Sequence, residues 1–206
     1  FAESIFAGKG LIDVDAFYEL LSRRFPDNRI LSHDILEGAY LRTAYVSDVE
    51  MTDTAPTSMG SWLSRLHRWL RGDWQNLIFL FRAYRAEGKT WRNPIGGLSR
   101  YKLFDNLRRS LNAPLCLACL VAALFLTGAP RLALALAGLL GVVFSSLWAA
   151  FFSLLGGGLS TLSRKFFTRT LPHAFELVGQ GVYQLIMLPA QGLVTLDAVL
   201  RSLWRT

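Results

Sequence analysis

Two long stretches of this chain carry no charged side chain. Residues 110–130 form an uncharged run of 21, and residues 132–163 form one of 32. A helix needs about 20 apolar residues to cross the hydrocarbon core of a bilayer. The pattern therefore predicts a transmembrane hairpin that turns at Arg131.

Basic residues flank this hairpin on both sides. They are Arg100, Lys102, Arg108 and Arg109 before it, and Arg164, Lys165 and Arg169 after it. Cytoplasmic loops carry an excess of Lys and Arg, so we expect both clusters in the cytoplasm and the Arg131 turn outside. Cys116 and Cys119 fall inside the first run and are interpreted as small apolar residues of a membrane helix.

A third uncharged run lies between Glu176 and Asp197, but Gln180, Gln184 and Gln191 interrupt it. Amide side chains are costly against lipid. The run therefore predicts either a packed third span or a helix lying at the membrane interface. We favour the interfacial helix, which keeps the C-terminus in the cytoplasm.

The N-terminal part reads as mixed α/β. Residues 11–25 predict a loop and then a helix, with Asp15 as its N-cap and one apolar face. That face consists of Phe17, Leu20, Leu21 and Phe25. Residues 33–44 predict a helix, residues 45–51 a short strand, and a long helix starts near residue 61.

Residues 74–84 repeat large apolar side chains at helical spacing, with arginines toward the flank. The members are Trp74, Leu77, Ile78, Phe81 and Tyr84. This predicts an amphipathic helix at a membrane interface, with an ordinary packed surface helix as the alternative. Asn93-Pro94 and Gly96-Gly97 should end it.

Charge is distributed unevenly. Residues 1–60 carry 5 basic and 10 acidic side chains, residues 61–109 carry 11 and 3, and residues 110–206 carry 6 and 2, which gives −5, +8 and +4 and the net +7. The local basic band fits anionic lipid or a phosphate-bearing substrate, and we expect no nucleic-acid partner. Phe1 is not an initiator Met, so we expect the chain to be a piece of a longer polypeptide.

Candidate chemistry concentrates in residues 65–75. On a helix Arg65, Trp69 and Asp73 line up at i, i+4 and i+8, with Arg68 and Arg71 nearby. Such a face offers guanidinium groups for phosphate and an indole for a sugar ring. A basic interfacial helix anchored by tryptophans explains the same pattern.

A second candidate is Ser32-His33-Asp34, with Glu37 and Gly38 following. An Asp at the start of a helix is favoured in its ionised form, and a helix cap is the plainer interpretation of Asp34. A third candidate is the Gly8-Lys9-Gly10 loop, whose glycines allow close approach of a ligand to the backbone. Asp13 and Asp15 follow it as caps or sugar contacts rather than as a metal-binding pair.

Residues 65–75 resemble the QxxRW signature of processive, family-2-type glycosyltransferases. In the longer form, Q-R-x-R-W-x-R-G-x-x-Q, residues Arg68 to Gln75 match in register, whereas Arg65 and Leu66 replace the first two letters. The cellulose-synthase form is therefore not fully matched, and the variant is similar to that of cyclic β-1,2-glucan synthases. The resemblance implies that Trp69 lies under the acceptor sugar and that Arg68 supports the nucleotide diphosphate. Arg65, Arg71 and Gln75 are the further substrate-binding candidates.

The other two candidates resemble the same family in order and spacing. An H-D pair some thirty residues before the RW pair implies that Asp34 is the catalytic base, with His33 and Glu37 as acceptor contacts. Phe6 to Phe17 resembles the F-x-G-K-G-I-x-D-V-D-A-F run of cyclic glucan synthases, which implies an acceptor-side loop of Gly8, Lys9, Gly10 and Asp15.

The resemblance implies the C-terminal part of an α/β, GT-A-like transferase domain followed by transmembrane helices, mostly helical overall. We expect a transferase part over residues 1–92, a cytoplasmic linker over 93–110, a membrane hairpin over 111–163, and a basic loop with a third membrane or interfacial helix over 164–206. UDP-glucose is the implied donor and a growing β-1,2-glucan the acceptor.

The implied Mg²⁺ or Mn²⁺ has its ligands outside this chain, in an upstream nucleotide-binding half, and a phosphorylase-like domain lies downstream. The implied location is a bacterial inner membrane with the catalytic part in the cytoplasm, and the chain by itself should be inactive. Two alternatives stay open: a transferase for another β-glucan such as a cellulose-like polymer, and a non-catalytic membrane scaffold.

Overall fold

The computed structural model describes residue 6 and residues 8–22, 24–25, 30–86, 88–156 and 166–205. The chain divides into two compact units. The first comprises Phe1–Ser110 with Asp197–Thr206, and the second comprises Leu111–Leu196. The described residues are mostly helical, with one two-stranded antiparallel sheet. They do not show a GT-A-like fold.

The first unit begins with two short helices, α1 (Val14–Leu21) and α2 (Asp34–Leu41). The Asp13 carboxylate caps α1 by accepting the Ala16 N–H at 3.0 Å, so the cap predicted at Asp15 is wrong and Asp15 lies in the first turn. The N-cap of α2 is His33, whose side chain makes no capping hydrogen bond. Asp34 is therefore not the cap but the first residue of the helix, where the macrodipole favours its charge.

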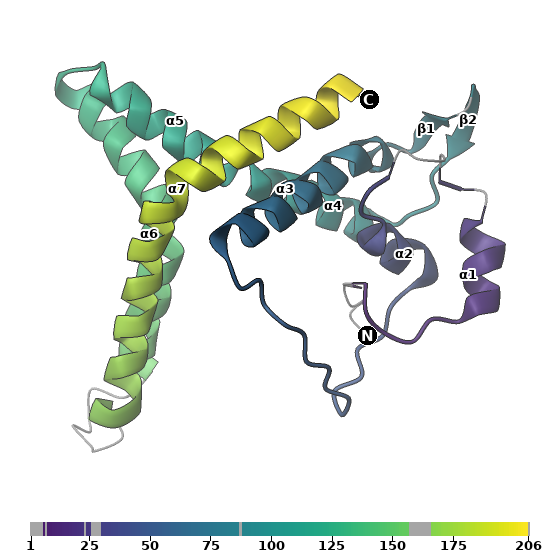
Figure 1. Cartoon of the computed structure of the whole chain (residues 1–206), viewed down its shortest axis with the longest axis horizontal. Coiled ribbons are helices and arrows are strands. Elements are labelled where there is room, and N and C mark those ends of the chain that lie inside the picture. The colour runs from purple at the N-terminus through teal and green to yellow at the C-terminus, as the bar shows by residue number, and fades with distance from the viewer. Residues whose placement is uncertain are drawn as a thin grey trace. The chain divides into compact units, whose positions relative to one another are not determined.

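The longest helix of this unit is α3 (Met59–Gln75), which Ser58 caps by accepting the Ser61 N–H at 3.2 Å. A 3₁₀ turn, η1 (Asn76–Leu80), continues it, and the hairpin β1 (Ala83–Ala86) and β2 (Lys89–Arg92) follows. The last helix of the first unit's N-terminal part is α4 (Gly97–Ser110). Figure 1 shows α2 beside the C-terminal end of α3, with the hairpin beyond it.

A small core explains why the helix predicted over residues 74–84 does not form. Phe79 and Tyr84 are buried with their ring centroids 4.7 Å apart, in a cluster with Leu36, Ile95 and Leu103. Phe81 between them is extended and 62% exposed, so the chain turns there from η1 into β1. Burial of Phe79 and Tyr84 in this core outweighs the helical spacing of the segment. The strand predicted over residues 45–51 is also wrong, because that segment forms no strand.

Asn93 joins the hairpin to this core. Its buried amide donates to the Phe79 carbonyl at 2.6 Å and to the Phe81 carbonyl at 3.0 Å, and its Oδ1 accepts from the Tyr40 hydroxyl at 3.1 Å. A buried amide must find such partners because an unmade hydrogen bond is costly. Asn93 therefore joins the hairpin to the core, and with Pro94 it follows a strand rather than the predicted helix.

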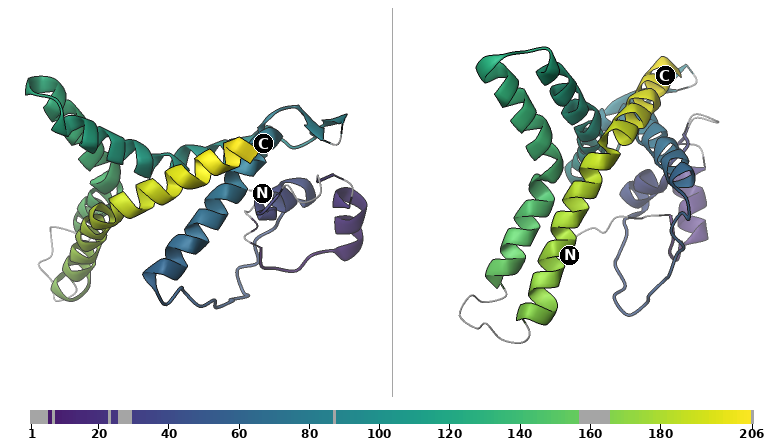
Figure 2. Two further views of the ribbon diagram at one scale, coloured as in Figure 1. Left: turned by 45° about the horizontal axis from the view of Figure 1, so that its top comes forward. Right: turned by 60° about the vertical axis from the view of Figure 1, so that its left-hand side comes forward.

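The second unit contains α5 (Asn112–Leu124), α6 (Gly128–Gly156) and most of α7 (Leu171–Arg205), which a π-helical turn, η2 (Phe166–Thr170), precedes. Glycines let the helices approach closely: a Cβ on Gly141 would meet the Cys116 sulfur at 2.5 Å, and one on Gly138 would meet Leu120. Figure 2 shows α6 and α7 side by side. On α6, exposed Phe144, Trp148 and Phe152 form an aromatic cluster suited to lipid.

Three helical stretches are long and apolar enough to cross a membrane: Gly97–Leu124, Gly128–Leu155 and Phe166–Trp204. The third meets the length and composition of a span, which is the alternative that the sequence analysis did not favour. The turn predicted at Arg131 lies earlier, because Gly128 (φ +68°) starts α6 and Arg131 belongs to its first turn. Arg164 and Lys165 of the predicted basic cluster lie outside the described residues, and the predicted orientation stays a prediction.

Candidate active site

The predicted RW motif and the predicted H-D pair meet through the C-terminal end of α3. The Gln75 Oε1 atom accepts the Leu31 N–H at 2.9 Å, and the Asn76 Nδ2 atom donates to the Ser32 carbonyl at 2.8 Å. A Cβ on Gly72 would collide with the side chain of Ser32. The segment just before His33 is thus fixed to α3 by two hydrogen bonds and one close backbone contact.

This contact explains why a glycine occupies position 72, since any Cβ there would collide with Ser32. We expect Gly72→Ala to destabilise the first unit by about 1–3 kcal/mol, because the added methyl group overpacks the Ser32 contact. Gly60→Ala on the same helix is the matched control, since a Cβ there meets nothing within 4 Å. Unfolding midpoints of the purified full-length protein measure both, and equal midpoints would contradict the contact.

Asp34, His33 and Glu37 form a compact cluster at the start of α2. Glu37 is buried, with its side chain 7% exposed, and its Oε1 lies 2.6 Å from His33 Nδ1. The Asp34 Oδ1 atom lies 4.0 Å from the same nitrogen, and the Asp34 side chain is 42% exposed. The buried carboxylate therefore holds the imidazole by Nδ1, whereas the carboxylate of Asp34 stays partly exposed.

The Gly8-Lys9-Gly10 loop lies against this cluster. Gly8 has φ +78°, and a Cβ there would lie 3.0 Å from both Asp34 carboxylate oxygens. Gly38 and Gly10 similarly pack against Phe6. Lys9 does not join the cluster but pairs with Asp53, and the hydrogen bond to Lys9 lowers the pKa of Asp53. Gly8 is thus the loop residue that approaches the predicted base.

Trp69 lies one turn before Gly72 on the side of α3 that contacts Ser32, since Arg65, Trp69, Gly72 and Asn76 share one helical face. The Trp69 ring is 53% exposed, and the Arg65 guanidinium carbon lies 5.7 Å from its centroid. Arg68 is exposed. The Arg71 Nε atom is buried and has no hydrogen-bond partner among the described residues.

The structure brings Gly72 and Gln75 of α3 to the segment before His33, and Gly8 to Asp34. Among the described residues, Lys9 and Asp15 do not join this cluster, and Arg65 and Trp69 contact each other rather than the cluster. Asp15 is exposed on α1 and makes no hydrogen bond to the Asp34 cluster within the described part of the chain. The side-chain oxygen of Gln75 already accepts the Leu31 N–H. The sequence analysis missed Asn76, which is 1% exposed. The one sequence feature that could have identified it is its place as a polar residue directly after the motif.

The ligand atoms of His33, Asp34 and Glu37 lie within 4.8 Å of one another. Mg²⁺ demands a near-octahedral set of oxygen ligands, and Mn²⁺ also favours oxygen. Here one of the two carboxylates is already bound to the imidazole at 2.6 Å. This donor set does not fit the divalent cation implied by the resemblance.

Asp73, inside the motif, is mostly buried between α3 and α4. Burial raises its pKa to about 6, and Asn106 and Arg109 oppose the rise only in part. Because the folded state then binds the proton more tightly than the unfolded state, stability falls as the pH rises from about 4 to about 6.

We therefore expect Asp73→Asn to stabilise the protein at neutral pH by up to about 3 kcal/mol and to change little near pH 4. Thermal unfolding of the full-length protein and the variant over that pH range measures the difference. Parallel curves would show that Asp73 is not responsible for the dependence.

No family model matches the chain. Among curated proteins, the cyclic β-(1,2)-glucan synthase NdvB of Rhizobium meliloti (strain 1021) is 36% identical to it over 212 residues. The chain is homologous to a small part of this glucan synthase. The aligned region covers 99% of the chain but 7% of the relative, so the chain spans a small fraction of that enzyme's length. The similarity to glucan synthases predicted from the motifs is thereby confirmed for a segment, and the roles of individual residues stay predictions.

Proposed function

We propose that this chain supplies the acceptor side of the transfer site in a membrane-embedded, inverting glycosyltransferase. The donor is UDP-glucose and the product a growing β-1,2-glucan, made at the cytoplasmic face of a bacterial inner membrane. The observation that carries the proposal is the contact of the RW helix with the H-D segment, through Gly72, Gln75 and Asn76, in a chain homologous to a glucan synthase.

In the proposed reaction Asp34 removes the proton from the acceptor hydroxyl. The oxygen attacks C1 of the donor glucose from the face opposite the leaving group, the bond from C1 to the diphosphate oxygen breaks, and UDP leaves with the electron pair. General-base catalysis of this kind contributes about 10²–10⁴-fold. The 42% exposure of Asp34 leaves room for the acceptor, and Gly8 lies against the carboxylate.

The neighbouring side chains have distinct proposed roles. The exposed face of Trp69 stacks on the acceptor sugar, with Arg65 held against its ring. The guanidinium of Arg68 supports the charge that develops on the departing diphosphate, a type of stabilisation worth about 10²–10³-fold in rate. Glu37 orients His33 by its Nδ1 atom, which leaves Nε2 for an acceptor hydroxyl. The nucleotide-binding half and any divalent cation belong to other parts of the polypeptide.

The direct test uses membranes that contain the full-length polypeptide. They are incubated with UDP-[¹⁴C]glucose, and the labelled polymer is analysed for linkage. The proposal expects 1,2-linked glucose from the full-length protein and no turnover by residues 1–206 alone. A different linkage would favour a transferase for another β-glucan. If the folded full-length polypeptide transfers no glucose, the interpretation as a non-catalytic scaffold is left.

A further inference from the structure

The last turns of α7 belong to the first unit, where they contact α3. Residues Asp197–Thr206 group with Phe1–Ser110, whereas the rest of α7 lies in the second unit. The Nε2 atom of His67 lies 2.9 Å from Oδ2 of Asp197, which is 130 positions later in the chain. A carboxylate oxygen can only accept a hydrogen bond, so the imidazole donates from Nε2. The contact therefore joins the end of α7 to the helix that carries the RW motif.

Both oxygens of the Asp197 carboxylate are engaged. Oδ1 accepts from Arg201 Nε at 2.8 Å, and Oδ2 accepts from His67. These two bonds in different directions fix the rotamer of Asp197. The side chains of His67 and Asp197 are 25% and 47% exposed. Since exposed ion pairs add little to stability, the consequence of this contact is the orientation of α3 rather than the free energy of unfolding.

A buried face of α7 accompanies the contact. Ala198, Val199 and Ser202 are 0%, 6% and 1% exposed. The Ser202 hydroxyl donates to the Ala198 carbonyl at 2.8 Å, and its oxygen also lies 3.3 Å from the Arg71 carbonyl. Small side chains at Ala198 and Ser202, one turn apart, let the two backbones come close. The end of α7 thus packs on α3 at both His67 and Arg71, which are also one turn apart.

The contact with α7 lies on the opposite side of α3 from the exposed indole. At 100° per residue, His67 is about 160° around the helix axis from Trp69. Along α3, His67 precedes Trp69, whereas Gly72 and Gln75, which contact the segment before α2, follow it. The helix is therefore held before and after Trp69 along its length, and the ring itself stays 53% exposed.

We propose that Asp197 is a positioning residue for the acceptor site. Through His67 it fixes the rotation of α3 about its axis, and so the direction in which the Trp69 ring faces. The inference rests on the proposed function, in which this ring stacks on the acceptor sugar. Because Asp197 lies in the Phe166–Trp204 stretch, it also ties the orientation of α3 to a helix long and apolar enough to cross a membrane.

The test measures initial rates of glucose incorporation by the full-length polypeptide in membranes, over a series of β-1,2-glucan oligomers and, separately, of UDP-glucose. We expect Asp197→Ala to raise the KM for the oligomers several-fold and to leave the KM for UDP-glucose near the parental value, because the poorly positioned group contacts the acceptor alone. Asp197→Asn keeps a side-chain oxygen that accepts from His67, so its KM for the oligomers should stay close to the parental value.

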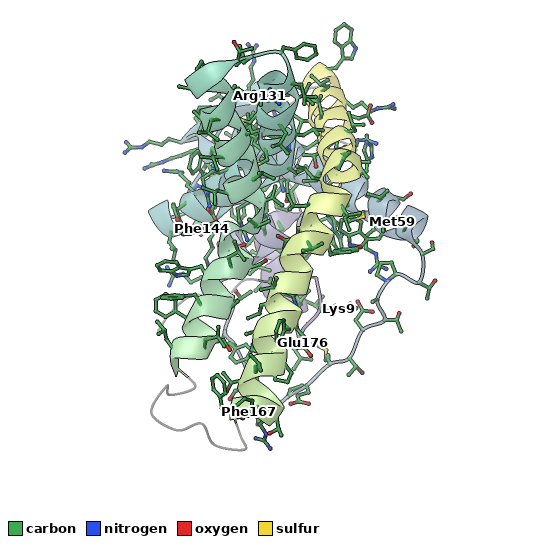
Figure 3. All side chains as sticks on the ribbon, turned by 90° about the vertical axis from the view of Figure 1, so that its left-hand side faces the viewer. Lys9, Met59, Arg131, Phe144, Phe167 and Glu176 are labelled. Carbon is green, nitrogen blue, oxygen red and sulfur yellow. The ribbon has the colours of Figure 1, made fainter. Side chains whose placement is uncertain are left out.

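Two further variants sharpen the comparison. His67→Ala should raise the KM for the oligomers as much as Asp197→Ala does, and the double variant should add no further increase, because both remove one interaction. Glu176→Ala is the matched control, since Glu176 pairs with His173 at 3.6 Å in the same helix but in the second unit. Figure 3 shows Glu176 toward the start of α7, away from its C-terminal end. This variant should keep the parental KM for the oligomers.

A distance measurement tests the contact without turnover. Nitroxide labels at Ser64→Cys on α3 and Leu200→Cys on α7, both exposed and both in the first unit, report the distance between the two helices. Other reactive cysteines of the full-length polypeptide are replaced first. Pulsed EPR should give one narrow distance distribution for the labelled parent and a broader one after Asp197→Ala, but not after Glu176→Ala.

Each contrary result overturns the inference. These results are a parental KM for the oligomers in Asp197→Ala, an equal rise in the KM for both substrates, additive effects in the double variant, and an unchanged distance distribution. A loss of activity matched by an equal loss of folded protein would likewise mean a structural role. If the unsubstituted polypeptide transfers no glucose, the proposed function itself fails, and the distance distributions alone decide whether Asp197 positions α3.

Discussion

The Asp34→Asn variant of the full-length polypeptide is expected to synthesise glucan about 10²–10⁴-fold more slowly than the parent, because an amide does not accept the acceptor's proton. The substitution keeps the size of the side chain. The carboxylate at the start of α2 contributes only about 0.3–1 kcal/mol through the helix dipole. The fold should therefore survive, and initial rates of glucose incorporation from UDP-glucose in membranes measure the effect.

Asp48→Asn is the control for this experiment, since Asp48 is exposed in the segment between α2 and α3. It should leave the rate unchanged. A parental rate in the Asp34→Asn variant would remove Asp34 as the base. A loss of rate with an equal loss of folded protein would instead assign it a structural role, so the amount of folded protein in the membranes is measured in parallel.

The second large effect is expected for Trp69→Ala. Loss of the ring removes the surface that orients the acceptor, and poor positioning of a reacting group costs about 10²-fold in rate. Since the ring is 53% exposed and outside the buried core, stability should change little. Elongation rates measured over a series of acceptor concentrations check the prediction.

Two comparisons sharpen the result for Trp69. Trp69→Phe keeps an aromatic face and should recover part of the rate. Trp204→Ala removes a tryptophan that is 91% exposed near the end of α7 and should have little effect. If Trp69→Ala and Trp204→Ala behave alike, Trp69 has no special relation to the acceptor.

The motif on α3 combines two kinds of residue. Gly72 and Gln75 hold the segment before His33 by packing and by hydrogen bonding. Arg68 and Trp69 stay exposed and available to a ligand. The spacing R-W-x-R-G-x-x-Q therefore places two exposed side chains one turn before the residues that hold the segment preceding His33.

Features encoded by local patterns were predictable from the sequence. The uncharged runs predicted helices that are long and apolar enough to cross a membrane, because length and charge decide that property. The helix at residues 33–44 was found because its apolar spacing agrees with its final packing. Two carboxylates, Asp13 and Asp15, could cap the start of α1, and Asp13 accepts the Ala16 N–H. The predicted start of the helix was therefore displaced by two residues, an error common at helix ends.

Features decided by contacts between distant residues were not predictable. Helical spacing over residues 74–84 gave way to η1 and β1, because Phe79 and Tyr84 pack with Leu36 and Asn93 bonds the intervening carbonyls. Likewise, the sequence identified Asp34 and Gly72 separately. The link between Gly72 and Ser32 joins residues forty positions apart, which no local pattern reveals.

The most direct measurement is a structure of the full-length polypeptide with a bound glucan end and UDP. The account predicts that the terminal sugar stacks on the Trp69 ring and that its reacting hydroxyl lies within about 2.6–3.2 Å of an Asp34 carboxylate oxygen. A glucan end bound elsewhere, with Asp34 and Trp69 facing different surfaces, would contradict it.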